Sequence, residues 1–227
     1  MRGAAGGPEA VGTLGTRRPL RSRQTRWAAA VAGWLVRRRV RPNQISVASV
    51  VFAGLAGGCL LLGAAAEPFW RGVLLICAAG CIQLRLLCNL ADGMVAIEGG
   101  FKTRSGEVYN DLPDRLADVL ILVSAGYTIP WAGGGGVLGW AAGLLAVLTA
   151  YVRLLGAATG VGHDFGGPMA KQHRMALMTV ACVAAALESA LGWRGWVMGT
   201  ALVLIIAGCA VTIARRTRRI VRALEAQ

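Results

Sequence analysis

The sequence predicts an all-α integral membrane protein with six transmembrane helices and an N-terminal interfacial amphipathic helix. Only 15% of the 227 residues are charged and 56% are hydrophobic, which leaves too few charges to coat a soluble domain of this size. The apolar residues gather into stretches of roughly 20, the length that crosses a ~30 Å hydrocarbon layer. Basic residues instead gather at the chain ends, where ten arginines precede Asn43 and five follow the last apolar stretch.

The N-terminal part of the chain divides into two segments. Residues 1–23 are rich in Arg, Gly and Ala and lack an apolar core, which predicts a disordered basic cytoplasmic tail. Residues 24–41 place Trp27 and Trp34 at helical spacing and end in a cluster of arginines. An aromatic and apolar face with cationic flanks is typical of a helix that lies in the lipid headgroup plane.

Six apolar stretches follow within a membrane domain that we expect at 42–214. They cover approximately residues 45–66, 69–97, 112–131, 137–159, 175–191 and 196–213. An even number of spans places both termini on one side, and the basic ends indicate that this side is the cytoplasm. Residues 215–227 then form a second basic cytoplasmic tail. The sequence therefore predicts a multi-pass protein of the cell (inner) membrane, with five tryptophans forming a belt at the outer interface (Trp70, Trp131, Trp140, Trp193 and Trp196).

Polar residues interrupt the end of the second stretch and the start of the third. On the second stretch, Asn89, Asp92, Gly93 and Ala96 fall within an arc of about 100° around the helix axis. On the third, an arc of similar width carries four oxygen-bearing side chains (Asn110, Asp111, Asp114 and Asp118). Ionisable residues inside a membrane mark a functional site by default. We expect the two arcs to face each other at one depth on neighbouring helices, at the cytoplasmic side.

The chemistry of these residues favours a hard cation. Carboxylate and amide oxygens without a His or Cys pair suit ions such as Mg²⁺, Mn²⁺ or Ca²⁺. Small residues beside the acids (Gly93, Ala96 and Gly106) leave room for a bulky ligand to approach the backbone. A simpler alternative is that these glycines serve only helix packing and that the acids cap helix ends.

This stretch resembles the CDP-alcohol phosphotransferase family. The family pattern reads D-x-x-D-G-x-x-A-R, then eight residues, then G-x-x-x-D-x-x-x-D. The matching positions follow one another here without a gap (Asn89, Asp92, Gly93, Ala96, Ile97, Gly106, Asn110 and Asp114). Six spans, an interfacial helix and the Pro42-Asn43 pair before the first span also resemble the family, over roughly residues 26–215.

The resemblance implies transfer of a phospho-alcohol group, here a phosphatidyl group, from a CDP-alcohol such as CDP-diacylglycerol to a small polar alcohol. CMP is released, and the reaction belongs to phospholipid synthesis. One or two Mg²⁺ or Mn²⁺ ions would bind the acids and the diphosphate, with Asp114 as the base. The donor would bind near Gly93, Ala96 and Gly106, with Asn43 close by. The family also implies a homodimer.

Three positions depart from the family pattern. Asn89 and Asn110 stand where the family has aspartate, and Ile97 replaces its arginine. An amide oxygen can ligate a hard cation but adds no charge and does not bridge two ions. Three hypotheses follow: the site holds one metal and the second arrives with the nucleotide; Asp111 and Asp118 substitute as ligands; or the protein binds a CDP-alcohol without turning it over.

Four basic residues are further candidates near the site. Arg85 lies one turn before Asn89, where it can snorkel, pair with an acid or contact an anionic substrate group. Arg153, Lys171 and Arg174 lie near the cytoplasmic face and could hold a phosphorylated acceptor or a lipid headgroup. The alternative for these three is the ordinary excess of basic residues on that side of a membrane.

Composition also bears on other function classes. The net charge of +13 would favour nucleic acid on a soluble fold, but its confinement to the chain ends favours membrane lipids and no nucleic acid. A small transporter is a further alternative, although the outer half lacks the polar groups that it would need.

Gly54 and Gly58 have the spacing that permits close helix packing. The acceptor stays open among glycerol phosphate, inositol phosphate, serine and a second lipid.

Overall fold

The computed structural model describes residues 26–98, 106–131, 133–192 and 195–226, and within them it leaves the side chains at 26, 28, 97, 98, 106, 107, 109 and 110 undescribed. These ranges form seven helices and no strand, which confirms the all-α prediction. The helices are α1 (Arg26–Arg37), α2 (Pro42–Ala65), α3 (Pro68–Glu98), α4 (Gly106–Tyr127), α5 (Gly134–Ala158), α6 (Lys171–Ala190) and α7 (Trp196–Glu225).

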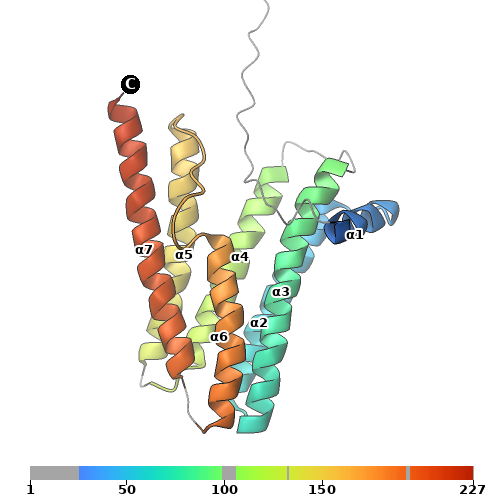
Figure 1. Cartoon of the computed structure of the whole chain (residues 1–227), viewed down its shortest axis with the longest axis vertical. Helices are drawn as coiled ribbons and strands as arrows, with labels where there is room; N and C mark the ends of the chain where they lie inside the picture. Colours follow the sequence, from blue (N-terminus) through green and yellow to red (C-terminus); the bar gives the residue numbers. More distant parts are fainter. Residues whose placement is uncertain (1–25, 99–105, 132, 193–194, 227) are drawn as a thin grey trace, which may run out of the picture.

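Helices α2 to α7 stand side by side as a bundle, and α1 lies across one of its ends (Figure 1). Four of them, α2, α3, α5 and α7, are long and apolar enough to cross a membrane, so the chain is a membrane protein. Helices α4 and α6 carry charged residues that we expected at the site, including Asp114 and Arg174. Because of these charges, the count of six transmembrane helices stays a prediction.

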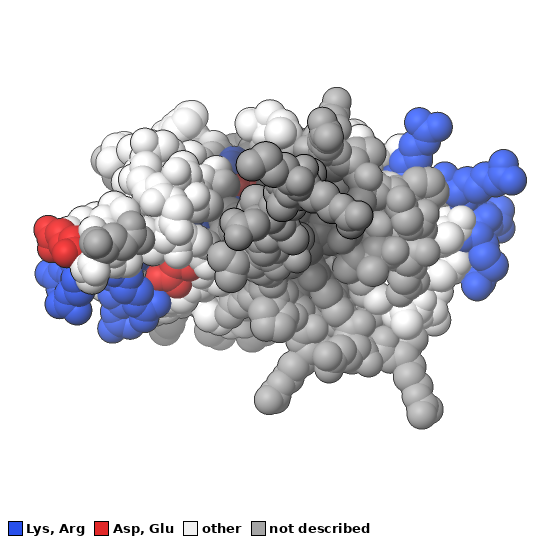
Figure 2. Space-filling model, turned by 90° about the horizontal axis from the view of Figure 1, so that it is seen from above, with Lys and Arg blue, Asp and Glu red and all other residues white. Residues whose placement is uncertain are grey.

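Helix α1 and the C-terminus lie at the same end of the bundle (Figure 1). Seen from that end, basic side chains gather at two opposite edges of the molecule, over α1 and over the end of α7 (Figure 2). The exposed arginines are Arg37, Arg38, Arg39 and Arg41 on one side and Arg215, Arg218, Arg219 and Arg222 on the other. This arrangement suits a face in contact with anionic headgroups, and its cytoplasmic orientation stays a prediction.

The junction between α1 and α2 is fixed by local capping. Pro42 occupies the first turn of α2, where its missing N–H costs no helical hydrogen bond. The preceding Arg41 is extended, and its backbone N–H donates to Oε1 of Gln44 at 2.9 Å. Helix α2 thus begins at a defined register, which sets the positions of Ser46 and Ser49 one and two turns later.

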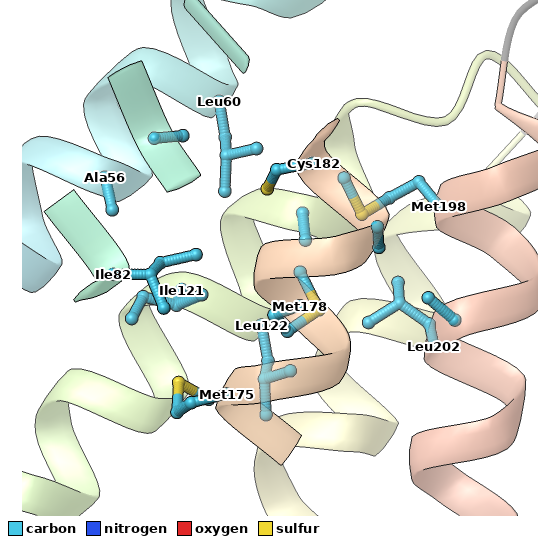
Figure 3. Packing of buried hydrophobic residues seen from close by; sticks show 14 of the residues in the cluster. Ala56, Leu60, Ile82, Ile121, Leu122, Met175, Met178, Cys182, Met198 and Leu202 are labelled. Atoms are coloured by element: carbon cyan, nitrogen blue, oxygen red, sulfur yellow. The ribbon is translucent and has the colours of Figure 1, made fainter. Parts of the chain in front are cut away.

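The core of the bundle is built from small and flexible apolar side chains. Alanines such as Ala56 let the helices approach, and larger residues such as Ile82, Ile121, Met178 and Leu202 fill the space between them (Figure 3). The large apolar residues that remain exposed, such as Leu62 and Leu144, occur on the bundle surface, as expected for a protein whose outer solvent is lipid.

Close packing of α4 on α5 depends on two facing glycines. A Cβ on Gly139 would lie 2.9 Å from the carbonyl oxygens of Leu122 and Val123, and one on Gly126 would lie 2.7 Å from the Cα of Gly139. Gly54 and Gly58, which we expected to permit packing, have no described atom within 4 Å of such a position. The two glycines therefore make no close helix contact within the described chain, and their expected role in packing stays a prediction.

We expect Gly139→Ala to destabilise the protein by about 1–3 kcal/mol, the usual cost of overpacking against atoms that cannot move aside. Gly54→Ala is the matched control, since the exposed Gly54 has open space around it. Thermal unfolding of the detergent-solubilised protein measures both variants. Equal losses of stability in the two variants would contradict this account of α4–α5 packing.

Helix α7 continues to Glu225, through most of the segment that we expected as a C-terminal tail. The physical reason is a buried face along this part of α7, formed by Thr212, Arg216 and Ile220. Arg216 donates through Nε to the carbonyl oxygen of Gly166 at 2.9 Å and through Nη1 to that of Thr149 at 2.7 Å. The segment is therefore a helical part of the bundle that presents arginines on its exposed face.

Candidate active site

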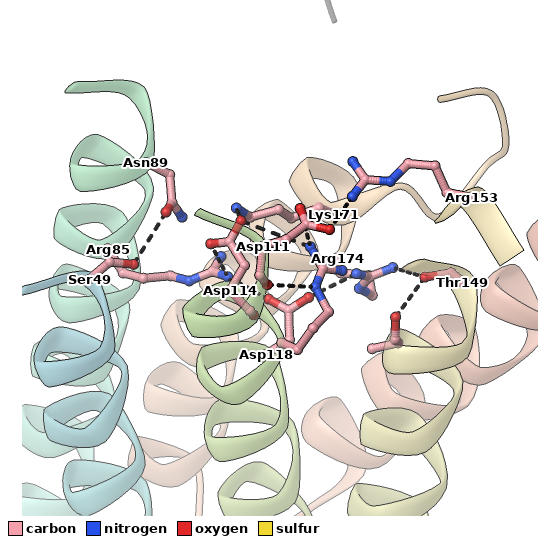
Figure 4. A network of polar contacts seen from close by, with 12 residues as sticks. Ser49, Arg85, Asn89, Asp111, Asp114, Asp118, Thr149, Arg153, Lys171 and Arg174 are labelled. Atoms are coloured by element: carbon pink, nitrogen blue, oxygen red, sulfur yellow. Dashed lines mark hydrogen bonds and ion pairs between the residues drawn. The ribbon is translucent and has the colours of Figure 1, made fainter. Parts of the chain in front are cut away.

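The predicted polar arcs lie at the end of the bundle that also carries α1 and the C-terminus (Figures 1 and 4). Helix α2 packs against both α3 and α4, whereas α3 and α4 hardly touch each other. In their described parts, the two helices that carry the arcs are therefore not packed directly against each other. Side chains bridge the two helices instead, and Arg85 is the main bridge.

Asp114 on α4 is buried and lies among cations. Its Oδ2 accepts from the ammonium group of Lys171, the first residue of α6. Its Oδ1 lies 3.6 Å from Nη2 of Arg85, and its Oδ2 lies 3.9 Å from Nη2 of Arg115. The side chain of Asp114 is 6% exposed and that of Lys171 is 25% exposed. The predicted base therefore forms an ion pair that joins α4 to α6, in which the lysine is the more exposed partner.

Asp118 lies one helical turn deeper and is shared by two arginines. Its Oδ1 accepts from Nη2 of Arg85 at 2.6 Å, and its Oδ2 accepts from Nη2 of Arg174 at 2.8 Å. Arg174 also donates to Oγ1 of Thr149 at 3.1 Å and to the carbonyl oxygen of Met169 at 2.9 Å. All three charged side chains are at most 1% exposed. This cluster ties α3, α4 and α6 together beneath Asp114 (Figure 4).

The arrangement bears on three sequence-based expectations, for Arg85, Arg174 and Asp118. Of the three roles considered for Arg85, pairing with an acid is the one found in the structure. Arg174 was a candidate for substrate contact, yet its guanidinium is buried and bonded to protein groups. Both oxygens of Asp118, a candidate metal ligand, are likewise occupied by arginines. In this structure Arg174 and Asp118 pair with each other one helical turn deeper in the bundle than Asp114.

Helix α2 supplies two hydroxyl groups that hold the residues of α3. Oγ of Ser46 donates to Oδ2 of Asp92 at 3.0 Å, and both residues are buried. Oγ of Ser49 donates to Oδ1 of Asn89 at 3.3 Å, whereas Nδ2 of Asn89 has no partner among the described residues. The Asp92 carboxylate also lies within electrostatic range of Asp114 and Lys171. Asp92 of α3 and Asp114 of α4 thus lie near one another, and their membership of one site with the other predicted residues stays a prediction.

Asp111 and Arg153 form a second, more exposed ion pair. Nη2 of Arg153 donates to Oδ2 of Asp111 at 2.5 Å, and the guanidinium carbon lies 5.5 Å from the ring centre of Phe165. Because both charged side chains remain partly exposed, the pair lies where a ligand can reach it. The pair links α4 to the end of α5 and to the segment that follows it.

The remaining predicted residues differ in how fully they are described. Gly93 and Ala96 are buried on α3, and Asn43 is partly exposed in the first turn of α2. Gly106 and Asn110 belong to α4, but their surroundings lie outside the described part of the chain, as does the side chain of Ile97.

Several contacts at the site were not predicted from the sequence. Ser46 and Ser49 stand three residues apart in an apolar stretch, a spacing that could have marked a polar face of α2. No sequence pattern indicated that Lys171 would pair with Asp114. At the opposite end, Glu188 is buried and accepts from the backbone N–H of Trp196 at 2.9 Å, and Arg71 is buried and donates to the carbonyl oxygen of Gly63 at 3.0 Å. The end of the bundle opposite the site thus contains two buried charged side chains.

Comparison with known proteins supports the fold. No family model matches the sequence. The chain is similar to the inner membrane protein YnbA of Escherichia coli (strain K12), with 26% identity over 163 residues that cover 72% of this chain and 76% of YnbA.

Among solved structures, the chain is similar to the phosphatidylinositol phosphate synthase (PgsA1) of Mycobacterium tuberculosis. With CDP-DAG bound, that enzyme matches with a TM-score of 0.68 and 19% identity, over 86% of this chain and 94% of the synthase. In complex with manganese and citrate, it matches with a TM-score of 0.66 and 17% identity, over 85% and 88% of the two chains. This chain therefore has the fold of a phosphatidylinositol phosphate synthase whose structure was solved with CDP-DAG bound.

Proposed function

We propose that this protein transfers a phospho-alcohol group, most simply a phosphatidyl group, from a CDP-alcohol such as CDP-diacylglycerol to the hydroxyl of a small polar alcohol. The proposal rests above all on the juxtaposition of buried Asp92 and Asp114 at one end of the bundle. The shared fold supports it, because the similar synthase was solved with CDP-DAG bound. The reaction would serve phospholipid synthesis, with the site at the cytoplasmic face of the cell membrane and the chain as a homodimer.

In the proposed reaction, the acceptor oxygen attacks the phosphorus atom that carries the alcohol of the donor. The bond between that phosphorus and the bridging oxygen breaks, and CMP leaves with the electron pair. The proton of the acceptor hydroxyl passes to the Asp114 carboxylate, which is aligned by Arg85 and Lys171. A base held in a fixed position typically contributes 10²–10⁴-fold to such a step.

The residues present fit one divalent cation of the Mg²⁺ or Mn²⁺ type. Asp92 and Asp114 provide two carboxylates, and Mg²⁺ is commonly held by one or two carboxylates together with substrate phosphates and water. Among the described residues, no group of three His, Cys, Asp or Glu side chains could hold a metal ion. Asn110 would add a neutral amide ligand, Asn89 would do so only if its Oδ1 left Ser49, and Asp111 remains the alternative carboxylate. When bound, the metal would neutralise charge on the diphosphate.

Donor and acceptor would bind at opposite sides of Asp114. We assign the cytidine diphosphate to the small residues Gly93, Ala96 and Gly106, with Asn43 nearby at the start of α2. Arg153 is a partly exposed cation beside Asp111, which suits an acidic group on the acceptor.

The proposal predicts that the purified protein releases CMP from CDP-diacylglycerol only when Mg²⁺ or Mn²⁺ and a suitable acceptor are present. A panel of glycerol phosphate, inositol phosphate, serine and phospholipid acceptors, each assayed with metal and with a chelator, identifies the acceptor. Removal of the metal should abolish release, because the diphosphate charge is then left largely unneutralised. CMP release that persists in the chelator would contradict the metal dependence.

A second candidate function is a CDP-alcohol-binding protein without turnover. Asn89 favours it, because its amide takes the place of a carboxylate and is bonded to Ser49. Saturable binding of CDP-diacylglycerol without CMP release from any acceptor would support this alternative. A transporter would show flux without CMP release.

A further inference from the structure

The charge balance around Asp114 differs from that of a site built to hold two divalent cations. Asp92, Asp114 and Asp118 face an equal number of cationic side chains, namely Arg85, Lys171 and Arg174. Arg115 adds a further cation 3.9 Å from Asp114. The described carboxylates are therefore already matched by protein charges, and little excess negative charge is left for metal ions.

Few oxygen atoms in this cluster are free to ligate. Both oxygens of Asp118 accept from arginines, and Asp111 accepts from Arg153. Oδ1 of Asn89 accepts from Ser49, which leaves its Nδ2 as a buried donor without a described partner. An unpaired N–H suits an oxygen of a phosphate group and not a metal ion. Asp92 and Asp114 remain as the carboxylates that can bind one cation.

Lys171 provides a positive charge beside Asp114, where a second cation would help to neutralise the diphosphate. It begins α6, its side chain is 25% exposed, and its ammonium group pairs with Asp114 (Figure 4). The Asp92 carboxylate lies within electrostatic range of the same ammonium. A lysine is a compact point charge on a flexible stem with three donors, so it can contact Asp114 and a phosphate oxygen together.

We propose that Lys171 takes over the charge-neutralising role of one metal ion, so that the site works with a single divalent cation and the Lys171 ammonium. This inference rests on the proposed function and names how its site handles the diphosphate. The ammonium would donate to a phosphate oxygen of the donor while holding Asp114 in place. The two asparagines fit this scheme, because a site with one metal fewer needs fewer carboxylates.

The test is a Mn²⁺ titration of the purified full chain, followed by electron paramagnetic resonance, which needs no turnover. The wild type should bind one Mn²⁺ per chain. Lys171→Met should tighten Mn²⁺ binding by at least ~10-fold, because a positive charge next to the ligands is removed. The same variant should lose most CMP release. Arg219→Met is the matched control, since Arg219 is 64% exposed and pairs with Asp164, not with Asp92 or Asp114, and it should leave Mn²⁺ binding unchanged.

A second set of variants covers the case in which Lys171→Met fails to fold. The first is the double variant Asn89→Asp with Asn110→Asp, and the second adds Lys171→Gln to it. The triple variant should bind a second Mn²⁺ more tightly than the double variant, which retains Lys171. Two Mn²⁺ ions per wild-type chain would overturn the proposal. It would also be overturned by unchanged Mn²⁺ affinity in both Lys171 variants, which would leave Lys171 as a contact for the acceptor. If no variant releases CMP, the proposed function fails while the Mn²⁺ stoichiometry can still be measured.

Discussion

Asp114→Asn is expected to lower CMP release by at least ~10²-fold while changing the affinity for the CDP-alcohol much less. The amide has nearly the shape of the carboxylate but cannot accept the proton of the acceptor hydroxyl. Asp114 is buried between Arg85 and Lys171, so the substitution also removes the negative charge that both cations face. Turnover, donor binding and thermal unfolding therefore need to be measured on the same preparation.

Two further variants separate the loss of the base from the loss of an ion pair. Asp114→Asn combined with Lys171→Met removes one charge of each sign, and it should regain stability while remaining inactive. Asp164→Asn is the matched control, because Asp164 pairs with the exposed Arg219 near the same end of the bundle, and it should retain activity. An Asp114→Asn protein that keeps near-normal turnover would exclude Asp114 as the base.

Much of the fold could be predicted from the sequence because membrane thickness restricts helix length. The expected stretches 45–66 and 137–159 correspond closely to α2 and α5. The expected face of α3 was also found, since Asn89 and Asp92 both reach α2 hydroxyl groups. Both predictions follow from local geometry, namely a rise of about 1.5 Å and a turn of about 100° per residue.

Contacts between helices could not be predicted in the same way. Lys171 meets Asp114 from 57 residues away, and that pairing depends on how α6 sits beside α4. Asp118 has the spacing of a metal ligand, but the packing of α3 and α6 delivers two arginines to it. The end of α7 was predicted to be a basic tail because it is rich in arginine. The four-residue spacing of Thr212, Arg216 and Ile220, which places them on one helix face, was the signal that it continues as a helix.

Replacing Asp118 by Asn is expected to destabilise the protein by about 3–5 kcal/mol, the cost of leaving buried charges without their partner. Arg174 would lose its countercharge and Arg85 would keep only the Asp114 carboxylate at 3.6 Å, and neither arginine can reach water because each is at most 1% exposed. Thermal unfolding in detergent, together with the yield of monodisperse protein, measures the effect. Asp164→Asn should cost no more than ~1 kcal/mol, since its partner Arg219 is 64% exposed.

A triple replacement distinguishes a structural role of Asp118 from a metal-binding one. Arg85→Met, Asp118→Leu and Arg174→Met together remove all three buried charges and keep similar volumes, a change that is often neutral or stabilising when the cluster is structural. Recovery of the unfolding temperature relative to Asp118→Asn would show that the cluster joins α3, α4 and α6. If Asp118→Asn instead remains stable but binds Mn²⁺ more weakly, Asp118 is a metal ligand and the arginines move away when the metal binds. The two outcomes differ in stability and in metal affinity, so neither can be mistaken for the other.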